Sequence, residues 1–154
     1  MSTPWERFAV AARRGTPDQV PVALIVDSPW LPGYAGIDTR DYYLFPDRWY
    51  AINRGLLERF PDAVWIPGWW IEYGMAVEPS AFGAKPHFYA DRPPSVEPVV
   101  ADLGFWAREI EPADPREDGL MPLVVRQYEA LDERLRAEGL GVRMVCARGP
   151  MTVA

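Results

Sequence analysis

The residues best suited to chemistry are gathered in one stretch, residues 62–83, which reads DAVWIPGWWIEYGMAVEPSAFG. Residues 63–66 have the length and apolar character of a buried strand, and Pro67-Gly68 breaks it. The break is followed at once by two tryptophans, a carboxylate and a tyrosine: Trp69, Trp70, Glu72 and Tyr73. A strand that ends in such a turn and leads into aromatic and acidic groups is one way in which an α/β protein builds a ligand pocket.

Glu72 is the candidate catalytic residue of this stretch. A carboxylate among aromatic side chains can accept a hydrogen bond from a ligand, or it can act as a general acid or base. The alternative is a loop carboxylate that caps a turn or pairs with an arginine. Trp69, Trp70 and Tyr73 are candidate ligand-binding residues, and at least one of the tryptophans is expected to serve only in packing.

The ends of two other predicted strands supply the remaining candidates. Asp27 follows the first strand and is the second candidate catalytic residue, or it caps the turn that comes next. Trp30 and Tyr34 lie in the following loop and are candidate ligand-binding residues. Arg148 follows the third predicted strand, where it can point into the same pocket or form an ion pair with one of the carboxylates.

Three apolar runs of strand length would position these residues, near 21–26, 63–66 and 142–147. Continuous runs of this kind are typical of parallel strands that are buried on both faces. Cys146, in the third run, is expected to be a small core residue. Helices alternate with the strands, so the pattern predicts parallel βαβ units. Residues 85–89 are a weaker strand candidate.

The predicted helices have recognisable ends. Thr3-Pro4-Trp5-Glu6 is a capping box with proline at the first helical position, and it predicts a helix over residues 4–14. Residues 46–60 and 114–139 repeat apolar side chains at helical spacing. Shorter helices are expected after Asp38, over 77–82 and over 103–110. The proline-rich residues 27–34 are expected to form a loop.

Composition excludes several classes of protein. The chain has 154 residues, of which 49% are hydrophobic, and a net charge of −6, so it lacks the positive surface of a nucleic-acid binder. Its single cysteine excludes an internal disulfide framework and fits a reducing compartment. No apolar run approaches the roughly 18 residues of a membrane helix, and the start does not read as a signal peptide. The sequence predicts a cytoplasmic protein with no nucleic-acid or membrane partner.

Several short motifs, in their order and spacing, resemble the N-terminal half of the uroporphyrinogen decarboxylase superfamily, which includes decarboxylases and corrinoid-linked methyltransferases. The motifs are Arg13-Arg14-Gly15, PDQVPV at 17–22, Leu31-Pro32-Gly33-Tyr34, Ile66-Pro67, Phe82-Gly83-Ala84 and Gly149-Pro150-Met151-Thr152. The resemblance covers nearly the whole chain. It implies an α/β fold, namely the N-terminal half of a (β/α)8 TIM-type barrel with its pocket at the carboxyl ends of the strands. Because a full barrel needs about 250 residues, residues 1–154 are expected to be one truncated barrel domain whose C-terminal half is missing.

Two departures from the family pattern bear on function. The decarboxylases carry an arginine pair after the first strand that binds the carboxylates of the substrate, whereas residues 27–30 here read DSPW. Their aspartate near the end of the second strand is replaced by PGWW at 67–70. An acidic and aromatic pocket suits a flat or apolar ligand, a cation or a methyl-bearing group better than a polycarboxylate. The resemblance therefore favours the methyltransferase branch, which moves methyl groups from methylamines or methanol toward coenzyme M.

The expected function is thus that of a corrinoid-linked methyltransferase-type enzyme with a small-molecule or corrinoid-protein substrate, although the fragment alone would be inactive. The alternatives are uroporphyrinogen III decarboxylase, of porphyrin and haem biosynthesis, and a non-catalytic fragment or binding module. The resemblance implies a zinc ion in the missing C-terminal half. His87 and Cys146 lack the spacing of its ligands, so no metal or other cofactor is assigned within this chain. An open sheet edge predicts contact with the missing half-barrel or with a second copy.

Overall fold

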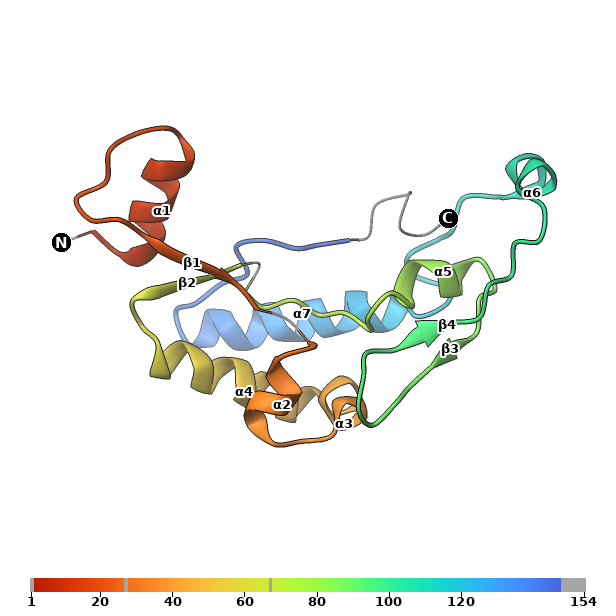
Figure 1. Ribbon diagram of the computed structural model, residues 1–154, viewed down its shortest axis with the longest axis horizontal. Helices are drawn as coiled ribbons and strands as arrows, with labels where there is room; N and C mark the ends of the chain where they lie inside the picture. Colours follow the sequence, from red (N-terminus) through yellow and green to blue (C-terminus); the bar gives the residue numbers. More distant parts are fainter. Residues whose placement is uncertain (1, 27, 67, 148–154) are drawn as a thin grey trace.

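The computed structural model describes residues 2–26, 28–66 and 68–147, and for Phe105 only the backbone (Figure 1). The molecule is elongated and curved. Helix α1 (Pro4–Ala12) lies at one end and helix α6 (Leu103–Glu109) at the other. Between them the remaining helices and a small parallel sheet form the body of the protein.

The sheet joins β1 (Val22–Ile25) and β2 (Ala63–Ile66) in parallel, with Val22 opposite Ala63 and Ile25 opposite Ile66. Three helices connect the strands: α2 (Leu31–Ala35), α3 (Thr39–Leu44) and α4 (Pro46–Arg59). Two parallel strands with a helical connection confirm the α/β class predicted from the sequence.

The prediction of a third strand over residues 142–147 was wrong, because this segment forms no strand in the described part of the chain. A cavity of about 290 Å³ separates β2 from the segment around Gly141 and Arg143, so the backbone there has no strand neighbour to bond. Val142 still packs against the core. Cys146, however, is exposed instead of being a core residue.

β1 also differs from its prediction. Apolar runs of this kind are usually buried on both faces, but all four residues of β1 are exposed, whereas Val64 of β2 is buried. The reason is that in the described residues the sheet has two strands, so no further strand is seen beside the outer edge of β1. Among the described residues there is accordingly a partial α/β fold and no closed barrel.

The helix ends predicted from the sequence are mostly confirmed. Thr3 and Glu6 form the reciprocal capping box of α1, and Asp38 caps α3 through the backbone N–H of Arg40. α4 begins at Pro46 as expected. The proline-rich segment expected to be a loop instead contains α2, which has Pro32 in its first turn, where proline needs no backbone N–H.

The C-terminal helix α7 (Met121–Ala137) begins later than predicted. Gly119 has a φ of +56°, a left-handed conformation that interrupts a helix, and Pro122 suits the first turn that follows. The other elements are α5 (Val77–Ala81), β3 (Pro86–His87) and β4 (Ser95–Val96), and the last two pair antiparallel. His87 is half-buried, and its Nε2 is hydrogen-bonded with Glu97 Oε1 at 2.7 Å.

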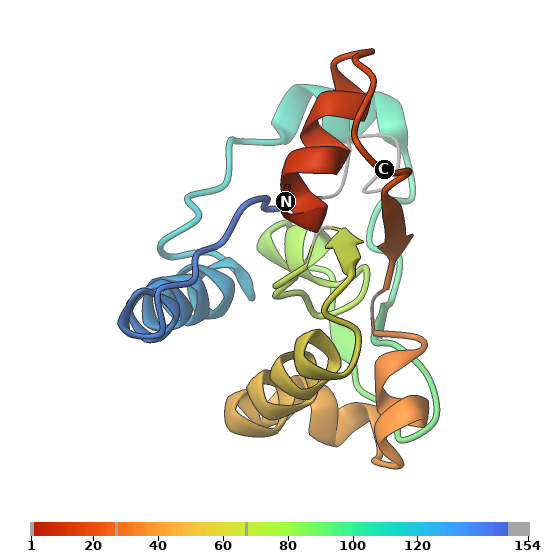
Figure 2. The same ribbon diagram turned by 90° about the vertical axis from the view of Figure 1, so that its left-hand side faces the viewer.

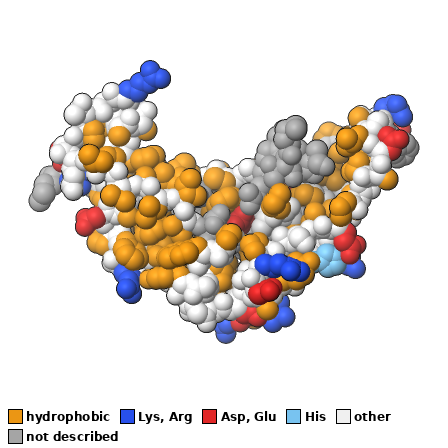
Figure 3. Space-filling view, in the orientation of Figure 1, with side chains coloured by type: hydrophobic (Ala, Val, Ile, Leu, Met, Phe, Trp, Pro, Cys, Tyr) orange, Lys and Arg blue, Asp and Glu red, His pale blue; other side chains and the backbone are white. Residues whose placement is uncertain are grey.

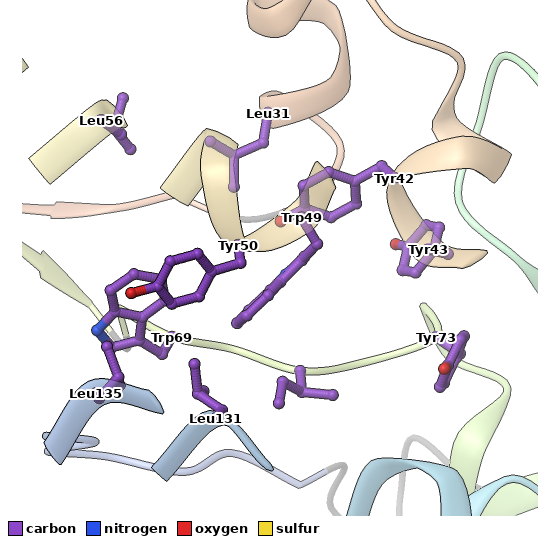
Figure 4. Close-up of a cluster of buried hydrophobic side chains, with 11 residues drawn as sticks. Leu31, Tyr42, Tyr43, Trp49, Tyr50, Leu56, Trp69, Tyr73, Leu131 and Leu135 are labelled. Carbon is purple, nitrogen blue, oxygen red and sulfur yellow. The ribbon is translucent and has the colours of Figure 1, made fainter. Parts of the chain in front are cut away.

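The core lies between α4 and α7, which run in similar directions (Figure 2). Aromatic rings from α4 meet the segment after β2, where Trp69 stacks on Tyr50 with ring centroids 5.2 Å apart. Leu131 and Leu135 of α7 close the cluster from the other side (Figure 4). Its full membership is Leu31, Tyr42, Tyr43, Trp49, Tyr50, Leu56, Trp69, Ile71, Tyr73, Leu131 and Leu135.

Polar side chains near the end of α7 also form contacts with α4. Glu138, the C-cap residue, accepts hydrogen bonds from the Tyr50 hydroxyl and from Arg54, the latter at 2.9 Å. Arg134 of α7 pairs with Asp47 at the start of α4 at 3.0 Å. α4 and α7 are therefore held by both apolar and charged contacts. None of the helices in the described residues has the length and apolar character needed to cross a bilayer.

Candidate functional site

The candidate site lies where β1 and β2 end. Because the strands are parallel and in register, the segments that follow Ile25 and Ile66 both leave the sheet at the carboxyl ends of the strands. Ser28 comes from the first segment and Glu72 from the second. The Ser28 hydroxyl donates a hydrogen bond to Glu72 Oε1 at 2.7 Å. The structure thus joins two residues that are 44 positions apart in the sequence.

The path of the chain after β2 explains how Glu72 reaches this place. Gly68 has a φ of +88°, a conformation that favours glycine and turns the chain out of the strand. Trp69, Ile71 and Tyr73 are buried in the core, while Trp70 and Glu72, which alternate with them along the chain, are half-buried. Alternate residues therefore anchor the segment, and the residues between them are available to the site.

A cavity of about 250 Å³ adjoins Glu72. Its walls are mostly apolar and come from the segment after β2, from α5, from α7 and from Cys146 and Ala147. The side chains that can interact with a polar or charged ligand are Trp70, Glu72, Glu78 and Cys146. No lysine or arginine is among the described residues that line it. The described lining therefore carries two carboxylates and one aromatic ring.

Tyr128 of α7 contacts the segment that carries Glu72. Its hydroxyl oxygen accepts a hydrogen bond from the backbone N–H of Ile71 at 3.1 Å. Burial raises the pKa of the Tyr128 phenol; the Ile71 N–H acts in the opposite direction, and nearby Cys146 and Glu72 raise the pKa further. The phenol therefore stays protonated at neutral pH and anchors the segment that carries Glu72.

Of the residues predicted from the sequence, the structure brings Glu72 and Trp70 together at this cavity. Trp69 and Tyr73 do not line it, because both are buried in the core. Gln127 donates a hydrogen bond to the Tyr73 hydroxyl at 2.6 Å, and burial raises the pKa of this phenol. One of the two tryptophans thus serves in packing, as expected.

Trp30 and Tyr34 lie apart from this cavity. They stack on each other along α2 with ring centroids 4.5 Å apart, and both are exposed. Neither lines the cavity beside Glu72. Asp27 and Arg148, the other two predicted site residues, lie outside the described residues.

Sequence reasoning missed Ser28 and Cys146 as site residues. Ser28 follows β1 directly after Asp27, so its place at a strand end was a usable signal. Cys146 was assigned to a buried strand, and the absence of that strand in the described residues leaves its side chain exposed at the cavity.

A larger cavity, of about 600 Å³, lies between α5, β4 and α6. It is lined almost entirely by apolar side chains, with Glu78 and Glu97 as its charged groups. It contains none of the predicted site residues. The smaller cavity, which does contain two of them, is therefore the better candidate site.

Within the described residues, no group of three or more histidine, cysteine, aspartate or glutamate side chains could hold a metal ion. Comparisons with family models, with curated proteins and with solved structures find no match for this chain.

Proposed function

We propose that this chain is part of a barrel enzyme of the uroporphyrinogen decarboxylase superfamily, of the corrinoid-linked methyltransferase type, whose ligand binds beside Glu72. The observation that carries the proposal is the Ser28–Glu72 hydrogen bond next to a cavity at the carboxyl ends of two parallel strands. In barrel enzymes the groups at this end of the strands carry the chemistry. The order of the sequence motifs supports the same family.

The ligand class that suits the cavity is a small methylated cation, such as trimethylammonium. Glu72 and Glu78 supply negative charge, and Trp70 supplies an aromatic face that attracts a cation. The apolar walls suit the methyl groups. A volume of about 250 Å³ is below the roughly 300–1,000 Å³ of sites for drug-sized ligands, so a molecule of few heavy atoms is favoured.

Each residue then has a definite task. Glu72 faces the positive charge of the ligand, and Ser28 fixes the orientation of the Glu72 carboxylate through its hydrogen bond. Trp70 packs against the methyl groups. The zinc ion of this enzyme class is assigned to ligands outside this chain, so no step of the reaction is attributed to a metal here.

The decarboxylase alternative is less favourable. Its substrate is a tetrapyrrole with eight carboxylates, which is too large for this cavity and of the wrong charge to approach Glu72 and Glu78. A non-catalytic binding module would bind the same cation without transferring a methyl group. Corrinoid-dependent methyl transfer toward coenzyme M by the complete enzyme separates that alternative from ours.

Binding can be tested by isothermal titration of the purified chain with trimethylammonium, with tert-butanol, a neutral molecule that also carries three methyl groups, and with uroporphyrin. Trimethylammonium is expected to bind with a dissociation constant on the order of 1 mM, given its four heavy atoms. Glu72→Gln should weaken its binding about tenfold or more, because an ion–ion attraction is lost at a partly desolvated site.

Glu97→Gln is the matched control, since it removes the same charge at a residue that pairs with His87 and does not line this cavity. It should leave the affinity for trimethylammonium unchanged. Equal binding of tert-butanol, or equal effects of both variants, would contradict the cation site. Tight binding of uroporphyrin would favour the decarboxylase.

A further inference from the structure

A further cavity, of about 360 Å³, lies between α4 and α7. Its charged lining residues are Asp47, Arg126 and Arg134, none of which lines the cavity beside Glu72. Its volume is within the roughly 300–1,000 Å³ of sites for drug-sized ligands. α4 precedes β2 in the chain and α7 follows it, so in the proposed barrel they would be neighbouring helices of the outer layer. The missing strands would pair with the open edges of the sheet and would not fill the space between these helices.

The inner wall of this cavity is apolar and aromatic. Its buried members are Trp49, Tyr50, Ile71 and Leu131. Figure 4 shows the Trp49 and Tyr50 side chains of α4 pointing toward α7. Both rings also contact Trp69 in the core, so their positions are fixed by packing. A flat apolar body can therefore dock against them with little reorganisation of the protein.

The outer rim contains a row of side chains on α7. Arg126, Ala130 and Arg134 line the cavity and are spaced four residues apart, so they lie along one face of the helix. At a rise of about 1.5 Å per residue, the backbones of the two arginines are about 12 Å apart along the helix axis. The small side chain of Ala130 leaves the space between them open.

The two arginines differ in their surroundings. The Arg134 guanidinium is held in place, because its Cζ lies 3.4 Å from the centre of the Tyr50 ring and the group pairs with Asp47 at 3.0 Å. Arg126 is exposed, and within the described part of the chain no carboxylate pairs with it. The positive charge of Arg126 is therefore available to a ligand.

This positive charge is a local feature. The chain as a whole carries a net charge of −6, and Figure 3 shows Lys and Arg side chains as small separate groups on the face viewed there. At the cavity beside Glu72 and at the cavity of about 600 Å³, the charged side chains of the described lining are carboxylates. Between α4 and α7, by contrast, two arginines and one aspartate line the cavity. Positive charge exceeds negative charge in its described lining.

We propose that this cavity binds a small aromatic carboxylate, with its rings against Trp49 and Tyr50 and its carboxylate on Arg126. A guanidinium can bind a carboxylate through two parallel N–H···O hydrogen bonds, which are stronger than those between neutral groups. Arg134 adds a second positive charge at the other end of the row. The ligand has the opposite charge to the methylated cation and uses different charged residues, so this site does not depend on the function proposed above.

Isothermal titration of the purified full chain with 2-naphthoate and 2-naphthamide tests this assignment. The two molecules have nearly the same shape and differ in charge. We expect 2-naphthoate to bind with a dissociation constant on the order of 1 mM. We expect 2-naphthamide to bind about fivefold more weakly or worse, because it cannot form the ion pair with Arg126. Equal affinities for the two molecules would overturn the proposal.

Arg126→Gln should remove this preference, because it weakens the binding of 2-naphthoate about fivefold or more and leaves that of 2-naphthamide unchanged. Arg136→Gln is the matched control, since Arg136 lies on the same helix, pairs with Asp132 and does not line the cavity. It should leave both affinities unchanged. Equal losses of 2-naphthoate binding in the two variants would show a response to overall charge and would overturn the proposal.

Two further measurements locate the bound molecule. Ala130→Phe fills the space between the arginines, so it should abolish the binding of both compounds. In two-dimensional NMR spectra of the wild type, 2-naphthoate should shift the amide signals of residues 46–50 and 123–134. Shifts confined to α5 and α6 would place it in the cavity of about 600 Å³ and would overturn the proposal. Undiminished binding by Ala130→Phe, with a native circular dichroism spectrum, would also overturn it.

Discussion

Glu138 shows how one exposed side chain can connect two helices. The hydrogen bond from the Tyr50 hydroxyl is the main cause that holds the pKa of Glu138 below its ordinary value, followed by the hydrogen bond from Arg54. Burial and the same carboxylate raise the pKa of Tyr50. The ionised carboxylate and the neutral phenol are thus the forms that stabilise the contact between α4 and α7.

The two pKa shifts predict the pH dependence of stability. Since the pKa of Glu138 is lower in the folded state, its stabilising contribution is present above the unfolded pKa of about 4.5 and is lost as the pH falls through the folded value. Since the pKa of Tyr50 is raised, its contribution is present below about 10 and is lost as the pH rises through the folded value. Glu138→Gln should therefore lower Tm at neutral pH and reduce the loss of Tm between about pH 6 and pH 3.

Glu58→Gln is the comparison for this prediction, because Glu58 also pairs with Arg54, at 3.2 Å, but does not contact Tyr50. Thermal melts followed by circular dichroism would measure both variants. If Tm fell by the same amount on acidification in Glu138→Gln and in the wild type, the contact at Glu138 would not determine the stability at acidic pH.

The placement of a candidate residue beside the cavity was predictable where its position after a strand defined it. Glu72 was identified because it follows a strand and a Pro-Gly turn. Which neighbour would enter the core could not be predicted, because Trp69 and Trp70 are the same residue type in adjacent positions. The direction of each ring depends on Gly68 and on the rings of α4, which come from another part of the chain.

At the level of elements, local sequence signals were sufficient for the helices with clear ends. The capping box of α1 and the proline that opens α4 act within a few residues, so they could be predicted. Strand formation at 142–147 could not be decided locally, because a strand needs a hydrogen-bonded neighbour. Apolar character alone does not supply one.

The junction between α5 and α7 depends on a glycine. A Cβ at Gly119 would lie 2.5 Å from the backbone nitrogen of Ala81 and 2.5 Å from Ser80 Oγ, and its φ is +56°. Ser80 Oγ also accepts a hydrogen bond from the N–H of Leu120 at 2.8 Å. Two elements therefore approach so closely here that a side chain has no room.

Gly119→Ala is accordingly expected to lower the free energy of unfolding by about 1–3 kcal/mol, through backbone strain and the steric contact. Gly55→Ala, in the middle of α4, meets no atom within 4 Å and should instead raise it by about 1 kcal/mol through helix propensity. Urea denaturation of the two variants measures the difference. If both substitutions changed the free energy of unfolding in the same direction, the close approach of α5 to Gly119 would not be important for stability.

At the scale of the whole molecule, the net charge of −6 opposes the association of two copies. Salt screens such repulsion, with a Debye length of about 10 Å at 0.1 M and about 3 Å at 1 M. Any self-association through apolar surface should therefore become tighter as the salt concentration rises, whereas association through ion pairs would become weaker. Sedimentation equilibrium at about 0.05 M and about 0.5 M sodium chloride distinguishes the two cases.

The contact between Arg54 and Glu138 has a consequence for biosynthesis. Its two residues are 84 positions apart, so the ribosome must add 84 residues after Arg54 before Glu138 exists. At about 5–20 residues per second this takes roughly 4–17 s. During that time the aromatic face of α4 has no α7 to cover it, and the nascent chain presents a surface that a chaperone could recognise.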